Sequence, residues 1–192
     1  MSDAPHPHDD AHDDAHERFA TSDAILDELD RTELKSLVHS MLWHLRCTDA
    51  FWFIQVEKEH GLTEAEDLNA AVWTKMGQMA AKDIVQRFGP FPPGIDGFLA
   101  AYRYFPWAIL VRFDFERPGP DELTFTVAQC PPQLARRKHG LGPYRCKHMH
   151  LGELQAFCAV IDPALRVDCQ YAPPDPHPDD HFCKFRISVS AE

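Results

Sequence analysis

The sequence predicts an α+β protein in which an N-terminal helical hairpin packs with a small antiparallel sheet and a further helix. Three observations support this fold class. Apolar residues recur at helical spacing between residues 30 and 88, short alternating apolar segments follow Pro106, and turns rich in Pro or Gly separate the segments. The 192 residues are 44% hydrophobic, so we expect one compact unit from about residue 30.

The first 20 residues predict a disordered, acidic, His-rich tail. They alternate Asp, Ala and His and contain almost no large apolar side chain to offset the entropy of ordering. Residues 1–30 hold ten acidic residues against one base, Arg18, so −9 of the net charge of −11 lies there. The bases of the remaining chain do not gather into a stripe, and we expect no nucleic-acid partner.

Two capping boxes predict the helical region, residues 21–104. Asp30 and Glu33 begin a long helix that ends near His60, before Gly61. Thr63 and Glu66 begin a second helix, which continues to the Gly-Pro pair at 89–90. A short helix is expected over residues 95–103, after a Pro-rich connector.

Residues 105–192 are expected to form the antiparallel sheet with one more helix. Alternation over 107–116 and 123–127, around the turn at 118–121, predicts a hairpin. A helix is expected over 150–161, ended by the Asp-Pro pair at 162–163. Two last strands near 165–171 and 182–189 are joined by a Pro-rich loop.

Four cysteines stand where these elements begin or end, and we expect them to hold a metal ion. They are Cys130, Cys146, Cys169 and Cys183. We expect Cys169 and Cys183 to meet across the last hairpin, and four thiolates would satisfy the tetrahedral preference of zinc. An iron–sulfur cluster is the alternative cofactor. The plain alternative is that these cysteines are small buried hydrophobic residues.

Four histidines are alternative ligands near these cysteines: His148, His150, His177 and His181. One of them would give a Cys₃His structural site. Two or more would leave a coordination position open for water, which is typical of a catalytic metal site. A solvated polar loop explains His177 and His181 equally well.

An aromatic-rich part of the helical hairpin predicts a small-molecule pocket. The polar side chains of Asp49, Glu57 and Asn69 lie among aromatic residues that include Trp52 and Trp73. A few polar groups in an apolar surround are typical of ligand sites. The alternative is that both tryptophans belong to the core and that the acids face solvent.

The stretch from Cys146 to Val189 resembles the end of the four-vinyl-reductase domain family. The similarity lies in the cysteine before a helix, the Asp162-Pro163 pair, Val167–Cys169 and Phe182–Ile187. It implies a small-molecule-binding domain whose zinc is held by Cys146, Cys169 and Cys183. Some relatives place a glutamate ligand where this chain has Arg166, so Cys130 is the first choice for the fourth ligand.

From about residue 31 the chain is also similar to uncharacterised bacterial proteins related to the L-2-amino-thiazoline-4-carboxylate hydrolase family, through Phe125–Cys130 and the later cysteines. This resemblance implies the same α+β arrangement and allows a ring-opening hydrolase.

Together these features predict a zinc-stabilised module that binds a small molecule. The alternative is a hydrolase of a small heterocycle, in which a metal-bound water or Cys130 attacks and His148, His150 or Glu57 moves protons. With no output domain in the sequence, a sensor would need a partner, and a homodimer is one expectation. No apolar run is long enough for a membrane helix and no leader peptide is recognisable, so we expect a cytoplasmic protein without a membrane partner.

Overall fold

A computed structural model describes residues 20–190 of the chain, which divides into two compact units, Met1–Cys47 and Thr48–Glu192. The predicted tail lies almost wholly outside the described residues. The first unit contains helix α2 (Ala20–Asp27), which was not predicted, and the beginning of α3 (Arg31–His60). The Asp30 carboxylate accepts hydrogen bonds from the backbone N–H groups of Thr32 and Glu33, and the Asp30 N–H donates to the Glu33 carboxylate. The first capping box is therefore confirmed.

Helix α3 ends at His60 and α4 (Leu62–Phe88) follows after one residue, as predicted. Gly61 joins them with a φ of 88°, a conformation that glycine adopts without steric cost. The second capping box is wrong, because Gly61 is the N-cap of α4 and no side chain caps this end. The Glu66 carboxylate instead accepts hydrogen bonds from Arg145.

The expected short helix is confirmed as α5 (Gly94–Tyr102), but the strand expected from residue 107 begins later. Residues Pro106–Leu110 form the one-turn helix α6, and strand β1 spans Arg112–Gly119. Pro106 occupies the first turn of α6, where its fixed φ suits a helix and its missing N–H costs no hydrogen bond. The apolar residues at 107–110 fit either structure, so the local pattern could not separate them.

The sheet contains β1, β2 (Glu122–Gln129), β3 (Leu165–Tyr171) and β4 (Cys183–Val189) in the order β1-β2-β4-β3. Every neighbouring pair is antiparallel. Phe125 stands at its centre, opposite Phe115 on one side and Phe185 on the other. Antiparallel sheet and helices together confirm the α+β class.

Two helices connect the strands. Helix α7 (Pro131–Lys138) was not predicted, and Cys130 is its N-cap, followed by two prolines in its first turn. Helix α8 (Lys147–Ile161) begins three residues before the expected start, with Cys146 as its N-cap, and ends before Asp162 as predicted. Cys130 and Cys146 thus lie at helix N-termini.

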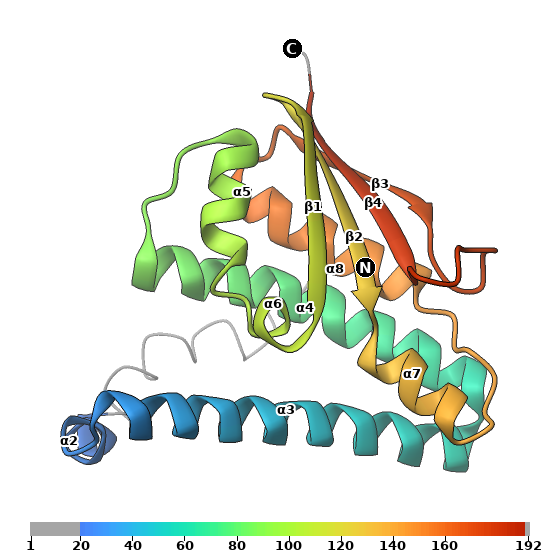
Figure 1. Cartoon of the computed structure of the whole chain (residues 1–192), viewed down its shortest axis with the longest axis horizontal. Helices are drawn as coiled ribbons and strands as arrows, with labels where there is room; N and C mark the ends of the chain where they lie inside the picture. Colours follow the sequence, from blue (N-terminus) through green and yellow to red (C-terminus); the bar gives the residue numbers. More distant parts are fainter. Residues whose placement is uncertain (1–19, 191–192) are drawn as a thin grey trace, which may run out of the picture. The chain divides into compact units, whose positions relative to one another are not determined.

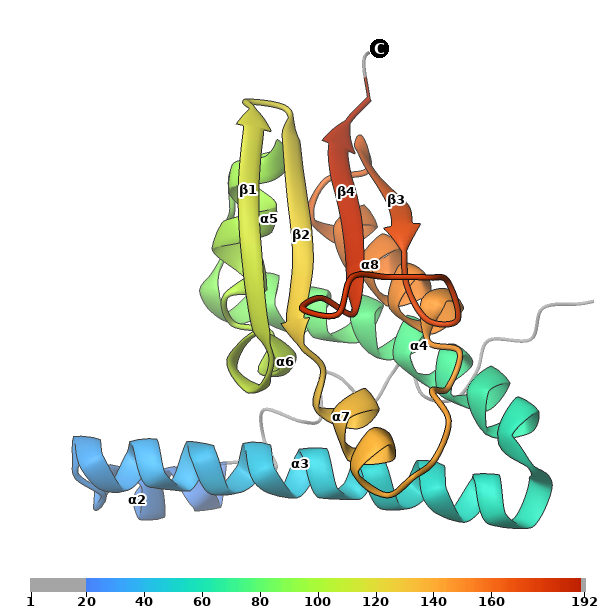
Figure 2. The same cartoon turned by 45° about the vertical axis from the view of Figure 1, so that its right-hand side comes forward.

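The core of the second unit lies between the sheet and the helices α4, α5 and α8, which occupy the same side of the sheet (Figure 1, Figure 2). Phe98, Leu154, Phe157, Phe125 and Phe185 are completely buried in it. Helices α4 and α8 approach closely, since a Cβ at Gly77 would lie 2.4 Å from the backbone oxygen of Glu153. This contact sets how closely α8 lies against α4, and therefore where the side chains of α8 stand.

Across residues 20–190, none of the helices combines the length and the apolar character that crossing a membrane requires.

Candidate functional site

A cavity of about 80 Å³ lies in the second unit, where side chains of α4, α8, β2 and β4 converge. Its wall is mainly apolar and includes Trp73, Trp107, Val127, Met149 and Phe182. One water molecule needs roughly 10–15 Å³ by this measure, so the cavity has room for roughly five water-sized groups. It therefore suits a very small ligand or the end of a longer one.

Polar groups interrupt this apolar wall. Asp49, Asn69, Tyr102, His150 and Glu153 all line the cavity. The Asp49 carboxylate accepts a hydrogen bond of 2.9 Å from the indole Nε1 of Trp73. The Tyr102 hydroxyl is buried and has no hydrogen-bond partner among the described residues. An unpaired buried hydroxyl is costly, and a ligand in the cavity is one group that would satisfy it.

Burial keeps His150 and Glu153 of the cavity mostly neutral near pH 7. Burial first, and the charge of Asp49 second, raise the pKa of Glu153 to about 8. Burial also raises the pKa of Asp49, although the hydrogen bond from Trp73 opposes this shift. The pKa of His150 falls to about 4, because burial disfavours the imidazolium form.

Three of the four predicted metal-binding cysteines, Cys130, Cys146 and Cys183, line this same cavity. Burial raises the pKa of Cys130 to about 11 and that of Cys146 to about 12. The pKa of Cys183 rises well above its ordinary value, first through burial and then through the charges of Cys146, Cys130 and Cys169. The thiols are thus close enough to influence one another, and they are protonated at neutral pH.

Cys169 is the exception, since it does not line the cavity. The register places Cys169 opposite Phe185, and Cys183 opposite Val127 of β2, so the two cysteines are not cross-strand partners as expected. An irregularity between Cys169 and Tyr171 shifts the pairing at this point. The spacing of the cysteines in the sequence does not reveal this register or its irregularity.

The donor groups do not fit a bound metal ion in this arrangement. Across residues 20–190, no three side chains of the His, Cys, Asp or Glu type stand together in a geometry that would hold one. Zinc and the iron–sulfur cluster therefore remain predictions.

Of the alternative ligands, only His150 joins the cavity, with its Nδ1 3.6 Å from the Cys183 Sγ. His148 lies beside Thr74 and Ala156, at a different surface between α4 and α8. His177 is half-buried, and its Nδ1 lies 2.9 Å from the backbone oxygen of Pro178. His181 pairs with Asp180 at 2.8 Å.

The predicted pocket residues separate in the same way. Asp49, Asn69 and Trp73 line the cavity, whereas Trp52 is 41% exposed and is not among the lining residues. Glu57 makes a two-pronged ion pair with Arg136, with N–O distances of 2.6 and 3.0 Å. Three of the predicted cysteines and three of the predicted pocket residues, which come from different parts of the sequence, thus line the same cavity.

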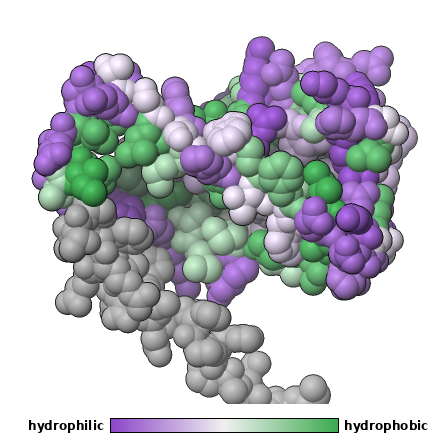
Figure 3. Space-filling view, turned by 90° about the horizontal axis from the view of Figure 1, so that it is seen from below, coloured by the Kyte–Doolittle hydropathy of each residue, from purple (hydrophilic) through white to green (hydrophobic). Residues whose placement is uncertain are grey.

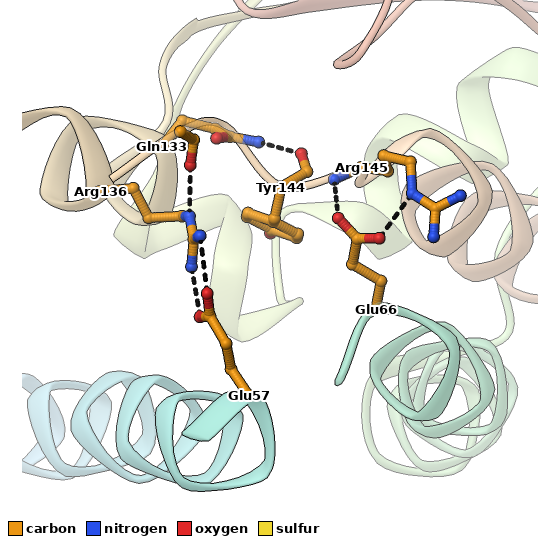
Figure 4. Close-up of polar contacts among 7 residues, drawn as sticks. Glu57, Glu66, Gln133, Arg136, Tyr144 and Arg145 are labelled. Atoms are coloured by element: carbon orange, nitrogen blue, oxygen red, sulfur yellow. Dashed lines mark hydrogen bonds and ion pairs between the residues drawn. The ribbon is translucent and has the colours of Figure 1, made fainter. Parts of the chain in front are cut away.

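The segment between α7 and α8, residues 139–146, carries Tyr144 and Cys146 to the cavity, and polar contacts hold it (Figure 4). Gln133 donates to the backbone oxygen of Tyr144 at 2.9 Å and to the Cys146 Sγ at 3.4 Å. The Arg136 guanidinium reaches from α7 to Glu57 and also donates to the Gly142 oxygen. Arg145 is bound to Glu66 through its backbone and side chain. The segment is therefore held by α7 on one side and by Glu66 of α4 on the other.

Sequence reasoning missed Tyr102 and Glu153 as cavity residues. Glu153 follows His150 by three positions, so both side chains lie on one face of α8. This spacing was the available signal, but only the tertiary packing shows that the face points into the cavity.

No curated protein matches this chain. The model of DUF6125, described as a family of unknown function, matches residues 27–189, and the chain therefore belongs to this family.

Proposed function

We propose that this protein binds a small, neutral, polar molecule in the cavity of its second unit. The observation that carries the proposal is the buried set of polar groups, among them the unpaired Tyr102 hydroxyl, in an otherwise apolar wall. Ligand sites characteristically combine apolar walls with a few convergent polar groups.

The size of the cavity limits the affinity. A ligand of roughly five non-hydrogen atoms gains at most about 1.5 kcal/mol per atom. The total of roughly 7 kcal/mol corresponds to a dissociation constant in the micromolar range at best. Tighter binding would require a longer molecule, of which only one end enters the cavity.

Ligand-observed NMR with a panel of small amides, ureas and thioamides tests this proposal on the full chain. We expect several of them to bind the wild type and none to bind Val127→Phe, since Val127 lines the cavity and a larger ring would fill it. Leu134→Phe is the matched control, because Leu134 is 41% exposed and is not a lining residue. Binding that survives Val127→Phe unchanged, or no binding to the wild type, would contradict the proposal.

We retain zinc, with an iron–sulfur cluster as the alternative, as a proposed cofactor. Its support is the convergence of Cys130, Cys146 and Cys183 on one cavity with His150 beside them. Binding would have to displace the thiol protons and rearrange the side chains, since ligands bind metals as thiolates. Elemental analysis and an absorption spectrum of untagged protein, purified without oxygen, decide the matter. A protein without stoichiometric zinc or iron would refute both cofactors.

A homodimer is the third part of the proposal. Leu68, Val72, Met76 and Met79 form an apolar row on α4 at helical spacing, and all four are at least 37% exposed. Figure 3 shows hydrophobic residues exposed between hydrophilic ones on one face of the molecule. A two-fold dimer brings the same patch of both copies together, so it would bury this row against its counterpart.

A further inference from the structure

A cysteine, a histidine and a glutamate stand next to one another in the wall of the cavity. The Cys183 Sγ lies 3.6 Å from the Nδ1 of His150. On the other side of the ring, the Nε2 of His150 lies 3.8 Å from a carboxylate oxygen of Glu153. A nucleophile beside a base is the arrangement of a nucleophilic catalytic site.

Regular secondary structure holds these three residues in place. His150 and Glu153 lie one turn apart on α8, and Cys183 begins β4, where it pairs with Val127. The imidazole also contacts two rings of the sheet, with centroid distances of 4.7 Å to Phe185 and 5.6 Å to Phe125. These contacts fix the position of the imidazole relative to the thiol without help from a flexible loop.

Cys183 differs in this respect from the other two thiols of the cavity. Cys146 accepts a hydrogen bond from the Gln133 amide, which is not a base. Cys130 caps α7 and has no imidazole contact in the described part of the chain. Of the three thiols, Cys183 alone has a group beside it that can accept its proton.

We propose that Cys183 is a nucleophile toward small acyl compounds, namely thioesters, esters or amides, and that His150 is its general base. This inference rests on the proposed function, because the acyl compound must enter the same cavity. It requires a free Cys183 thiol, so it and the zinc proposal exclude each other. It also replaces Cys130, the nucleophile expected from the sequence, by Cys183.

The reaction proceeds in two steps. The Cys183 Sγ attacks the carbonyl carbon and forms an S–C bond, while its proton moves to the Nδ1 of His150. The bond between carbon and the leaving group breaks, and the leaving group takes this proton and departs as a thiol, alcohol or amine. Water then attacks the acyl-enzyme, which releases the carboxylic acid and restores the Cys183 thiol.

One further feature suits this chemistry. The Tyr102 hydroxyl, which has no hydrogen-bond partner among the described residues, lines the same cavity. Such a donor stabilises the oxyanion that develops on the carbonyl.

S-Methyl thioacetate is a suitable probe, because it consists of a few atoms and fits a cavity of this size. We expect the full wild-type chain to gain one acetyl group, which tandem mass spectrometry places on Cys183, and to release methanethiol. The half-buried Cys47 and Cys169 are more accessible to solvent than Cys183, so a reagent that follows accessibility alone would label them first. Acetylation of those cysteines without Cys183 would overturn the proposal, and this measurement needs no variant.

His150→Gln should lower the rate of Cys183 acetylation by about 100-fold or more, which is the contribution of a general base. Cys47→Ala, which removes a thiol outside the cavity, should leave the rate within a few-fold of the wild type. Equal rates for the wild type and His150→Gln would overturn the role of His150.

Should the small amides bind the wild type while Cys183 stays unmodified, the nucleophile is refuted but the binding function stands. If the amides do not bind either, both proposals fail.

Discussion

At the scale of single residues, burial of Glu153 is the feature with the clearest consequence for stability. The carboxyl is 5% exposed, and its pKa lies at about 8 in the folded protein against an ordinary value of 4.5. Between these values the folded protein holds a proton that the unfolded chain has released. The contribution of this group to stability is therefore complete below pH 4.5 and is lost as the pH rises through 8.

We predict that the free energy of unfolding falls across this interval by up to about 1.4 kcal/mol per pH unit more in the wild type than in Glu153→Gln. The neutral amide keeps the shape of the protonated acid and removes its titration. Asp49, His150 and Cys183 face the same cavity in both proteins, so the difference between the two curves isolates Glu153. Urea unfolding at several pH values measures it, and parallel curves for the two proteins would disprove the prediction.

At the scale of elements, the contact between α4 and α8 determines where His150 and Glu153 stand. Gly77 allows the contact, because any Cβ there would meet the Glu153 backbone oxygen at 2.4 Å. Backbone atoms cannot yield as the end of a side chain can, so a larger residue must push the two helices apart. The same displacement would move Glu153 and His150 relative to Cys183.

Gly77→Ala should accordingly destabilise the protein by about 1–3 kcal/mol, the range for overpacking of a core. This loss occurs although alanine favours a helix by about 1 kcal/mol over glycine. Gly119→Ala is the control, since a Cβ there has no neighbour within 4 Å, and its effect should stay within about 0.5 kcal/mol. Midpoints of chemical unfolding measure both variants. A Gly77→Ala protein as stable as the control would show that α8 can move without cost.

At the scale of the whole molecule, the apolar row on α4 is the surface where we expect two copies to associate. We predict a dimer by size-exclusion chromatography with light scattering, and a monomer when Val72 and Met76 are both replaced by Glu. Two buried charges on each partner face cannot be paired, and each is costly to desolvate. Ala71→Glu introduces a charge at an exposed position of α4 outside the row and should leave the dimer intact. A wild type that is monomeric at all concentrations would contradict this prediction.

Local sequence patterns were sufficient for most of the fold. Helical periodicity, the Asp30 capping box and the glycine at 61 predicted the long helices and their junction, because these signals act between residues a few positions apart. The strands of the sheet were also predicted from local patterns, because apolar and polar residues alternate along them. The strand start at residue 107 and the second capping box were wrong, since more than one local structure satisfied each pattern.

The sequence by itself also determined which residue types the site contains: the cysteines at element ends, and Asp49, Asn69 and Trp73 on the helical hairpin. Only the tertiary structure decided that Cys130, Cys146 and Cys183 face the same cavity as that triplet, that Glu57 turns away to Arg136, and that His150 rather than His148 stands beside a thiol. The reason is physical. Side-chain direction within an element follows a short period, but the register of β4 and the approach of α8 to α4 depend on the packing of residues that are far apart in the chain.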